Sequence, residues 1–386
     1  MKKEIKNKQE RGITLIALVV TIVVLLILAG VSISLVINNN GVISKAKEAR
    51  DKYAEAQTND EKQLEETSDW IDEMETGIKK VDGVPIPEGF VYVGGTKDSG
   101  LVISDNSDED REKYKGQTTV GTDLKGNQFV CIPVENIADY KRTAYSGLIA
   151  SGITDTATNS EQIKYSSSDS DYFKEALPAD EKTSVETNKG FYIGRYEAGD
   201  QESTNSKKLR ARGASISNTI TVKAGQAPYN YVTRTQAKSL AEGFSTKQKY
   251  TSVKSKLVSS YAWDTAIAFI QKTNSDYGSS SEEGNYKNSP TFTYTGIADT
   301  EKNKQTKKNG TSTLIPTGQT TAVNNIYEMG GNVNEWTTES YSNTGSTYTH
   351  RGGSYSNNFA SSPAGYRVSS SDSAYVGTGF RLTLFL

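Results

Sequence analysis

Cysteine and histidine are almost absent from this sequence of 386 residues, which contains only Cys131 and His350 of these two types. A single cysteine excludes an intrachain disulfide, and a single histidine excludes a metal site built from several histidines. A nucleophilic triad needs a histidine beside its Ser or Cys, so His350 is the only possible base. We interpret His350 as a solvated side chain in a polar loop. Cys131 lies in the apolar run FVCIPV and is interpreted as a small buried hydrophobe.

An excess of positive charge is also missing, because 44 basic residues face 46 acidic residues and the net charge is −2. Nucleic-acid binding usually requires a clear basic excess, so we expect no nucleic-acid partner. Tryptophan (3) is rare, whereas tyrosine (22), glycine (33) and serine are abundant, a mixture typical of a loop-rich extracellular fold. The length allows a stalk with one large globular domain or two small ones.

An uncharged, largely apolar run occupies Ile13–Ile37 and follows a short basic leader. A helix over this run would cover the roughly 30 Å of bilayer hydrocarbon. The positive residues that precede it predict a cytoplasmic N-terminus: Lys2, Lys3, Lys6, Lys8 and Arg11. The run is longer than the apolar core of a secretory signal peptide. An ordinary membrane anchor remains an alternative.

Residues 1–50 resemble the start of type IV prepilins and pseudopilins, especially those of Gram-positive bacteria. The resemblance implies cleavage after Gly12 by prepilin peptidase and methylation of the new N-terminal Ile13. It also implies contact with a membrane or pilus assembly machinery, and a C-terminal domain at the cell surface on a single-pass anchor or in a pilus. Prepilins usually carry Glu five residues into the mature chain. Ala17 stands there in this sequence, which leaves filament assembly open.

The sequence predicts four consecutive regions: a leader at 1–12, a membrane or pilin helix at 13–37, a helical stalk at 38–83 and a globular domain at 84–386. Helical spacing of apolar residues over Lys45–Gly77 indicates the stalk helix. The segment Val84–Pro87 (VPIP) marks the entry into the domain, because proline prevents a helix there.

Within the domain, short apolar runs between turn residues predict strands. Two amphipathic helices are expected, at Arg234–Glu242 and at Tyr261–Thr273. The polar stretches Ser151–Lys189 and Thr273–Gly310 are expected to be loops.

Four motifs follow one another in the second half of the chain: GFYIGRYEAG at Gly190–Gly199, NIYEMGGNVNEW at Asn325–Trp336, RGGS at Arg351–Ser354 and GFRL at Gly379–Leu382. Together they resemble the formylglycine-generating-enzyme (sulfatase-modifying factor) family, a branch of the C-type lectin fold, over roughly residues 84–386. The resemblance implies an α+β fold with twisted antiparallel sheets, two helices and much irregular loop. The same motifs can also serve fold maintenance alone, with Trp336 as a buried aromatic.

The resemblance does not extend to the family's chemistry. Formylglycine formation uses a pair of copper-binding cysteines late in the chain, and the related sulfoxide synthases bind iron through three histidines. This sequence has neither set. We therefore expect no enzyme activity, because a fold alone does not carry a function. A formylglycine-generating or sulfoxide-synthase-type oxidoreductase is the enzymatic alternative.

A structural calcium ion is the one cofactor that the resemblance implies for this chain. Its ligands would be the carbonyl oxygens of Gly330, Gly331 and Val333 and the carboxylate of Glu335. Carbonyl and carboxylate oxygens are suitable ligands for this hard cation. The alternative is that Glu335 forms a local salt bridge or cap.

The C-terminal tail has an unusual alphabet. After Glu339 the sequence contains no Lys, Glu, Gln, Met or Trp, whereas Tyr341–Thr378 is rich in Ser, Tyr, Asn and Gly. Randomising the adenines of Asn codons gives this set of residues, so the tail resembles the variable regions of proteins diversified by retroelements, which also use the C-type lectin fold. The alternative is that turn-rich β segments favour these residues anyway.

Tyrosine with small polar residues suits binding, as in antibody loops. The candidate contacts for an extracellular protein or glycan are Tyr355, Ser356, Asn357, Asn358, Phe359, Tyr366, Arg367, Ser369, Ser371, Asp372 and Tyr375. The sequence thus predicts a surface-displayed, pilin-anchored binding protein. A structural pseudopilin, whose globular domain only decorates a fibre, is a further alternative.

Overall fold

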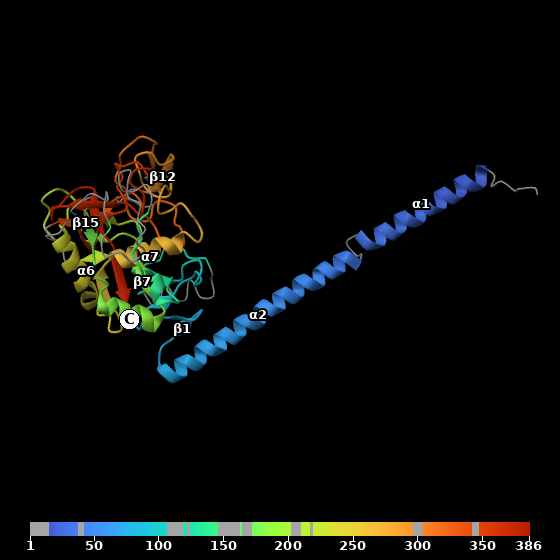
Figure 1. Ribbon diagram of the computed structural model, residues 1–386, viewed down its shortest axis with the longest axis horizontal. Coiled ribbons are helices and arrows are strands. Elements are labelled where there is room, and N and C mark those ends of the chain that lie inside the picture. The colour runs from blue at the N-terminus through green and yellow to red at the C-terminus, as the bar shows by residue number, and fades with distance from the viewer. Residues whose placement is uncertain are drawn as a thin grey trace, which may run out of the picture. The chain divides into compact units, whose positions relative to one another are not determined.

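The computed structural model describes residues 15–37, 42–105, 119–121, 124–145, 163, 172–201, 210–216, 219–295, 304–341 and 347–386. The chain divides into two compact units, Met1–Ser68 and Asp69–Leu386. Figure 1 gives the labels of the elements.

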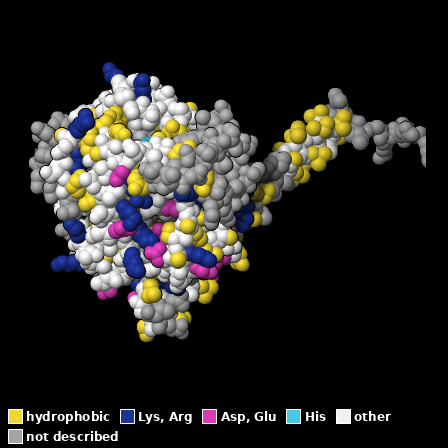
Figure 2. Space-filling view, turned by 60° about the vertical axis from the view of Figure 1, so that its left-hand side comes forward, with side chains coloured by type: hydrophobic (Ala, Val, Ile, Leu, Met, Phe, Trp, Pro, Cys, Tyr) yellow, Lys and Arg dark blue, Asp and Glu magenta, His cyan; other side chains and the backbone are white. Residues whose placement is uncertain are grey.

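The first unit contains α1 (Leu15–Ile37) and most of α2 (Val42–Thr76), which covers the predicted stalk helix. Large apolar side chains of α1 are exposed from Leu18 to Val31 (Figure 2). No helix in the described part of the chain combines the length and the hydropathy needed to cross a membrane. That finding does not support the membrane helix expected at 13–37. The processing residues Gly12 and Ile13 lie outside the described residues.

The second unit is built around a six-stranded antiparallel sheet. Its spatial order is β11 (Lys254–Leu257), β18 (Leu382–Phe385), β7 (Gly190–Gly194), β5 (Gln128–Pro133), β4 (Val102–Ser104) and β3 (Val91–Tyr92). Alternate side chains of β5 enter different cores, because successive residues of a strand point to opposite faces. Val130 and Ile132 belong to one core, and Phe129 and Cys131 to the other. The sheet is therefore buried on both faces.

Helices pack on both faces of this sheet (Figure 1). Buried side chains of α7 (Ser260–Ile270) join the core of Val130, and those of α6 (Arg234–Gln248) join the core of Phe129. The α6 helix begins with a capping box in which Thr233 and Gln236 satisfy each other's backbone N–H groups. Both helices were predicted, but α6 continues past its expected end at Glu242, and α7 ends before Thr273.

A second sheet carries the tail. Its order is β16 (Arg367–Ser370), β15 (Thr347–Arg351), β14 (Asn334–Tyr341) and β17 (Thr378–Phe380), with β6 (Phe173–Lys174) paired to β14 as the fifth strand. The β14–β17 pair is parallel and places Glu335 opposite Gly379. The motif strands NVNEW and GFRL therefore lie side by side, although they are far apart in the sequence.

Smaller elements complete the unit: β1 (Lys80–Val81), β2 (Val84–Pro85), η1 (Ile137–Asp139), α4 (Ala179–Asn188), β8 (Gly199–Asp200), β9 (Ile220–Thr221), β10 (Ala227–Pro228), β12 (Phe292–Thr295) and β13 (Lys304–Lys307). These elements contradict two loop predictions. The stretch 151–189 contains β6 and α4, and the stretch 273–310 contains the β12–β13 hairpin. Few apolar residues mark these elements, so the pattern gave no signal. The predicted α+β class is confirmed.

Candidate functional site: the tail and its buried supports

The arginine of the GFRL motif is a buried structural residue. Arg381 donates from Nη2 to Glu335 Oε1 (2.7 Å) and from Nε to Glu335 Oε2 (2.9 Å), and neither side chain is exposed. The same guanidinium donates to the carbonyls of Gly194 and Tyr327, both at 2.8 Å. A bidentate pair of this kind fixes geometry. Arg381 thus connects β14 to the start of β18 and to β7. These contacts support the interpretation that the GFRL motif maintains the fold.

The predicted calcium site does not fit this arrangement. Both oxygens of Glu335 accept hydrogen bonds from Arg381, so a cation there would meet a positive guanidinium at close range. Gly331 has a left-handed backbone (φ +77°), and its N–H donates to the carbonyl of Gly352 (2.8 Å). Among the described residues, no group of three or more His, Cys, Asp or Glu side chains could hold a metal ion. Glu335 therefore forms the local salt bridge that was the alternative, and its carboxylate does not fit the calcium-ligand role in the predicted set Gly330, Gly331, Val333 and Glu335.

A second buried cluster of charges lies beneath the tail. Asp264 on α7 accepts from Arg351 Nη2 (2.6 Å) and from Arg367 Nη2, and Glu339 accepts from Arg367 Nε (3.2 Å) and from Arg142 Nη2. All five side chains are buried. Burial would raise the pKa of Glu339, but the three guanidinium groups lower that pKa to about 2. The cluster joins β14, β15 and β16 to α7.

The structure contradicts the prediction that Arg367 contacts a ligand. Its side chain is 1% exposed and is held by Asp264 and Glu339. The sequence could not reveal this role, because an arginine between Tyr366 and Ser369 has the same local pattern as an exposed binding residue. Its acidic partners lie 103 and 28 residues away along the chain.

His350 and Cys131 are both buried. Cys131 lies on β5, and burial raises the pKa of its thiol to about 12, so its interpretation as a small hydrophobe is confirmed. His350 is not in a polar loop. It lies on β15 opposite Trp336, whose ring meets the imidazole edge to face at 5.2 Å between centroids. The β-pairing of Thr347–Arg351 with β14 buries it, and the solvated interpretation was wrong.

Replacing His350 by Phe should remove one source of acid sensitivity. Burial lowers the pKa of His350 to about 4, whereas an unfolded chain has its histidine pKa near 6.5. The unfolded state therefore binds more protons between these values, and stability falls as the pH drops through this window. Relative to wild type, His350→Phe should gain about 2 kcal/mol in free energy of unfolding between about pH 6.5 and 5. Urea unfolding at both pH values tests this; parallel pH profiles would show that His350 titrates normally.

The remaining tail candidates differ in exposure. Ser356, Asn358, Ser371, Asp372 and Tyr375 are exposed. Tyr355, Asn357, Phe359, Tyr366 and Ser369 are half-buried. Of the eleven predicted contacts, five are thus exposed, five are half-buried and Arg367 is buried.

Several of these residues have structural partners. Phe359 packs against Tyr286, with 6.3 Å between ring centroids, and Tyr366 packs against the core that contains Val130. Asn357 Oδ1 accepts from the N–H (2.9 Å) and hydroxyl (2.8 Å) of Ser354. Asp372 accepts from the N–H (3.1 Å) and hydroxyl (2.5 Å) of Thr235 at the start of α6. Tyr355 and Tyr375 are therefore the aromatic candidates that are least involved in contacts within the fold.

The turn that carries Tyr375 is held by residues outside the tail. The carbonyl of Tyr375 accepts from the N–H of Tyr231 (3.0 Å), and the carbonyl of Val376 accepts from Asn230 Nδ2 (2.9 Å). The next carbonyl, of Gly377, accepts from the N–H of Asn334 (2.8 Å). Three consecutive carbonyls are thus fixed to β14 and to the loop before α6. This turn has a defined position.

Tyr375 and Val376 are 47% and 41% exposed. From Lys79 to the end of the chain, they are the only large hydrophobic residues in the described part that are exposed to this degree. Positive and negative side chains are interspersed on the face shown in Figure 2. Earlier in the second unit, Trp70, Ile71, Met74 and Ile78 are also exposed, so the tail turn is the exposed apolar site only of the part that follows Ile78.

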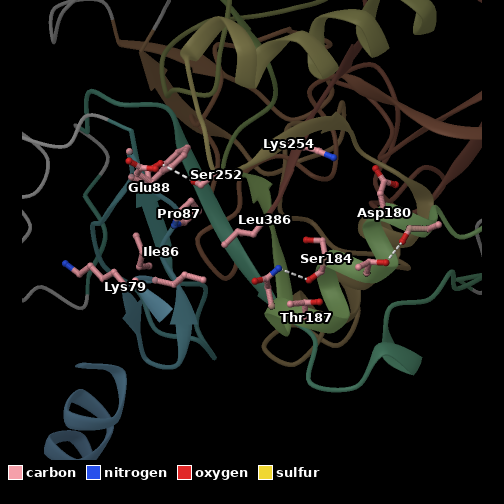
Figure 3. Close-up of a pocket in the computed structure, with 17 residues that line it drawn as sticks. Lys79, Ile86, Pro87, Glu88, Asp180, Ser184, Thr187, Ser252, Lys254 and Leu386 are labelled. Carbon is pink, nitrogen blue, oxygen red and sulfur yellow. Dashed lines mark hydrogen bonds between the residues drawn. The ribbon is translucent and has the colours of Figure 1, made fainter. Parts of the chain in front are cut away.

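A cavity of about 1000 Å³ lies elsewhere in the second unit (Figure 3). One wall is apolar and includes Ile86, Pro87 and Phe90, and the other is the polar face of α4, with Thr183, Ser184 and Thr187. Its carboxylates, Glu88 and Asp180, have no histidine or cysteine beside them. None of the tail candidates lines this cavity. It can accept a ligand, but its residues do not form a catalytic constellation.

Comparison with known proteins places these features in a family. Residues 162–384 match the sulfatase-modifying factor enzyme 1-like (FGE-sulfatase) domain. Comparison with curated proteins gave no match.

Three solved structures are distantly similar. CarF shares 17% identity, covering 51% of this chain and 87% of that chain, with a TM-score of 0.33. PvdO from Pseudomonas aeruginosa shares 15% identity, covering 69% and 98%, with a TM-score of 0.40. Treponema denticola variable protein 1 shares 17% identity, covering 51% and 85%, with a TM-score of 0.30. These similarities are too distant to assign a function. The family match spans more than half of the chain, and the chain therefore belongs to the sulfatase-modifying factor enzyme 1-like (FGE-sulfatase) family.

Proposed function

We propose that this chain is a binding protein that captures an extracellular ligand through its C-terminal tail. The observation that supports it most strongly is the position of Tyr375 and Val376. They are exposed large hydrophobics on a turn whose carbonyls are fixed by Tyr231, Asn230 and Asn334. Rigid, exposed aromatic side chains give contact area at low entropy cost. The same segment has the restricted alphabet that adenine randomisation produces, which supports retroelement diversification of this surface.

The proposal excludes the oxidoreductase chemistry of the family for a chemical reason. Copper and iron sites of the two known types need cysteine pairs or several histidines, and the chain has one residue of each kind, both buried. Turnover of a cysteine peptide or of a thiol substrate, with copper or iron added, would overturn this part of the proposal.

Display at the cell surface is proposed from the N-terminal unit. Apolar side chains of α1 are exposed from Leu18 to Val31, and they need cover from lipid or from neighbouring α1 helices. The basic leader and Gly12–Ile13 support processing of the prepilin type. Cell fractionation separates the two arrangements: an anchored receptor stays with membranes, whereas a filament subunit appears in sheared pili. A freely secreted chain would contradict both.

Binding should depend on the exposed turn. A library of disulfide-cyclised heptapeptides, displayed on phage and selected on the full chain, provides probes in the absence of a known ligand. The double variant Tyr375→Ser/Val376→Ser should weaken selected peptides by about 2 kcal/mol or more, because it removes the exposed apolar anchors. Its free energy of unfolding should change by less than about 1 kcal/mol, since both residues are exposed and the backbone carbonyls that fix the turn are unchanged.

The matched control is a Tyr→Ser substitution on helix α2. Tyr53 is 73% exposed on α2, so Tyr53→Ser removes an exposed tyrosine away from the turn. Peptides should bind this variant as they bind wild type. Equal binding to the Tyr375→Ser/Val376→Ser variant would place the binding face elsewhere, with the cavity of Figure 3 as the next candidate.

A further inference from the structure

Tyr231 has a backbone conformation that its residue type disfavours. Its φ is +50°, in the left-handed region, where bulky side chains are rare and strained. The other non-glycine residues with positive φ have evident reasons. Asp82, Asn324, Asn325 and Asn332 are types that tolerate this region, and Lys189 and Lys249 end helices α4 and α6. Glu328 accepts hydrogen bonds from three backbone N–H groups, those of Gly318, Gln319 and Thr320.

Among the described residues, the Tyr231 side chain forms no hydrogen bond, ion pair or ring contact, and it is half-buried. The hydrogen bond that holds the residue comes from its backbone N–H, which any amino acid except proline would supply. Asparagine or glycine would adopt the same backbone with less strain. Backbone strain at such a residue is a sign of function.

The position of Tyr231 links two tail tyrosines. Its N–H donates to the carbonyl of Tyr375, so its backbone adjoins the exposed turn. The pKa of the Tyr355 phenol is raised by burial and, second, by the proximity of Tyr231. Tyr355 also lies against Gly377, with Cε1 3.6 Å from where a Cβ would stand. Tyr231, Tyr355, Tyr375 and Val376 therefore form one surface, which we name the tyrosine patch.

The two charged residues closest in sequence to Tyr375 and Tyr231, Asp372 and Arg234, already have partners. Both oxygens of Asp372 accept from Thr235. Arg234 donates to the carbonyls of Thr337 (3.3 Å) and Thr338 (3.1 Å), and it stacks on the ring of Tyr348 at 4.7 Å. The patch thus offers rings, phenol hydroxyls and an aliphatic side chain, but no free charge. That chemistry fits an uncharged apolar anchor, and exposed Val376 among the rings favours an aliphatic or aromatic side chain over a sugar.

From these observations we infer that Tyr231, a residue outside the tail, is a fixed part of the ligand face, and that the partner is a protein that inserts a neutral apolar side chain into the tyrosine patch. This inference rests on the proposed binding function and deepens it. Tail residues would then vary around an anchor that is constant in position. The strain at Tyr231 is retained because its ring is needed there.

The test uses the selected cyclic peptides and the variants Tyr231→Asn and Tyr231→Phe of the full chain. Asn keeps the left-handed backbone, so Tyr231→Asn should hold or raise the thermal unfolding midpoint and weaken peptide binding about tenfold or more. Tyr231→Phe keeps the ring and should bind within about threefold of wild type. The selected peptides should share an aromatic or aliphatic residue. Tyr53→Asn is the control and should leave binding unchanged.

The alternatives give different results. If Tyr231→Asn binds normally while Tyr375→Ser/Val376→Ser does not, the inference fails and the proposed function stands. If neither variant loses binding, both fail. A lower unfolding midpoint in Tyr231→Asn would show that the tyrosine is structural and overturn the inference. The protein partner is overturned if cyclic peptides do not bind, but neutral oligosaccharides on a glycan array bind in a Tyr375-dependent way.

Discussion

Replacing Arg367 by alanine is expected to lower the free energy of unfolding by about 3–5 kcal/mol. The variant leaves Asp264 with one guanidinium partner and Glu339 without its close contacts to Arg367 Nε. Buried charges that lose a partner are costly, because the protein interior solvates them poorly. Urea unfolding measured by far-UV circular dichroism gives the value directly.

Arg212→Ala is the matched control, because Arg212 is an exposed arginine of the same unit. Its effect should stay within about 0.5 kcal/mol. The contrast also decides between two roles for Arg367. If Arg367→Ala kept full stability but lost peptide binding, Arg367 would be a ligand contact, as the sequence predicts, and the buried cluster would be wrong.

Sequence reasoning reached the fold because its signals are local. The apolar run FVCIPV predicts a strand, and β5 sends its side chains alternately into two cores. Trp336 was expected to be buried, and it is, with its Nε1 donating to the carbonyl of Val232 (2.9 Å). The motif order of GNVNEW, RGGS and GFRL led to the family that the match then established. Each of these signals is contained in a few neighbouring residues.

The supports of the site could not be predicted in this way. Arg351 and Asp264 are 87 residues apart, and Arg381 and Glu335 are 46 apart. Nothing near an arginine in the sequence tells whether it meets solvent or a distant carboxylate. The same limit explains the calcium prediction, which named Glu335 as a ligand but did not include its partner Arg381. Tyr231 gave no signal, because its strain exists only in the folded backbone.

The glycines of RGGS give the second large effect. Gly353 has φ +70°, and a Cβ built on it would stand 2.1 Å from the carbonyl oxygen of Ser362. Gly353→Ala should therefore cost both left-handed strain and the displacement of a backbone group, together about 3 kcal/mol or more. Thermal and urea unfolding measure this cost.

Gly310→Ala separates the two contributions. Gly310 has a similar φ of +83°, but no atom lies within 4 Å of its Cβ position, so only the strain of about 1 kcal/mol should remain. The excess at Gly353 then measures the clash with Ser362. That clash also bears on function. The N–H of Ser362 donates to the carbonyl of Asn358 (3.0 Å), so moving Ser362 shifts the loop with Asn357, Asn358 and Phe359.

Binding by Gly353→Ala therefore distinguishes two ligand faces. If the selected peptides contact only Tyr231, Tyr375 and Val376 of the tyrosine patch, whose turn is fixed separately by hydrogen bonds from Asn230, Tyr231 and Asn334, the folded fraction of this variant should bind nearly normally. If the face also includes the Asn357–Phe359 loop, affinity should fall although Tyr375 and Val376 are unchanged. Peptide titration at a temperature where the variant is fully folded decides between these outcomes. A variant with equal stability to Gly310→Ala would contradict the close approach of Gly353 to Ser362.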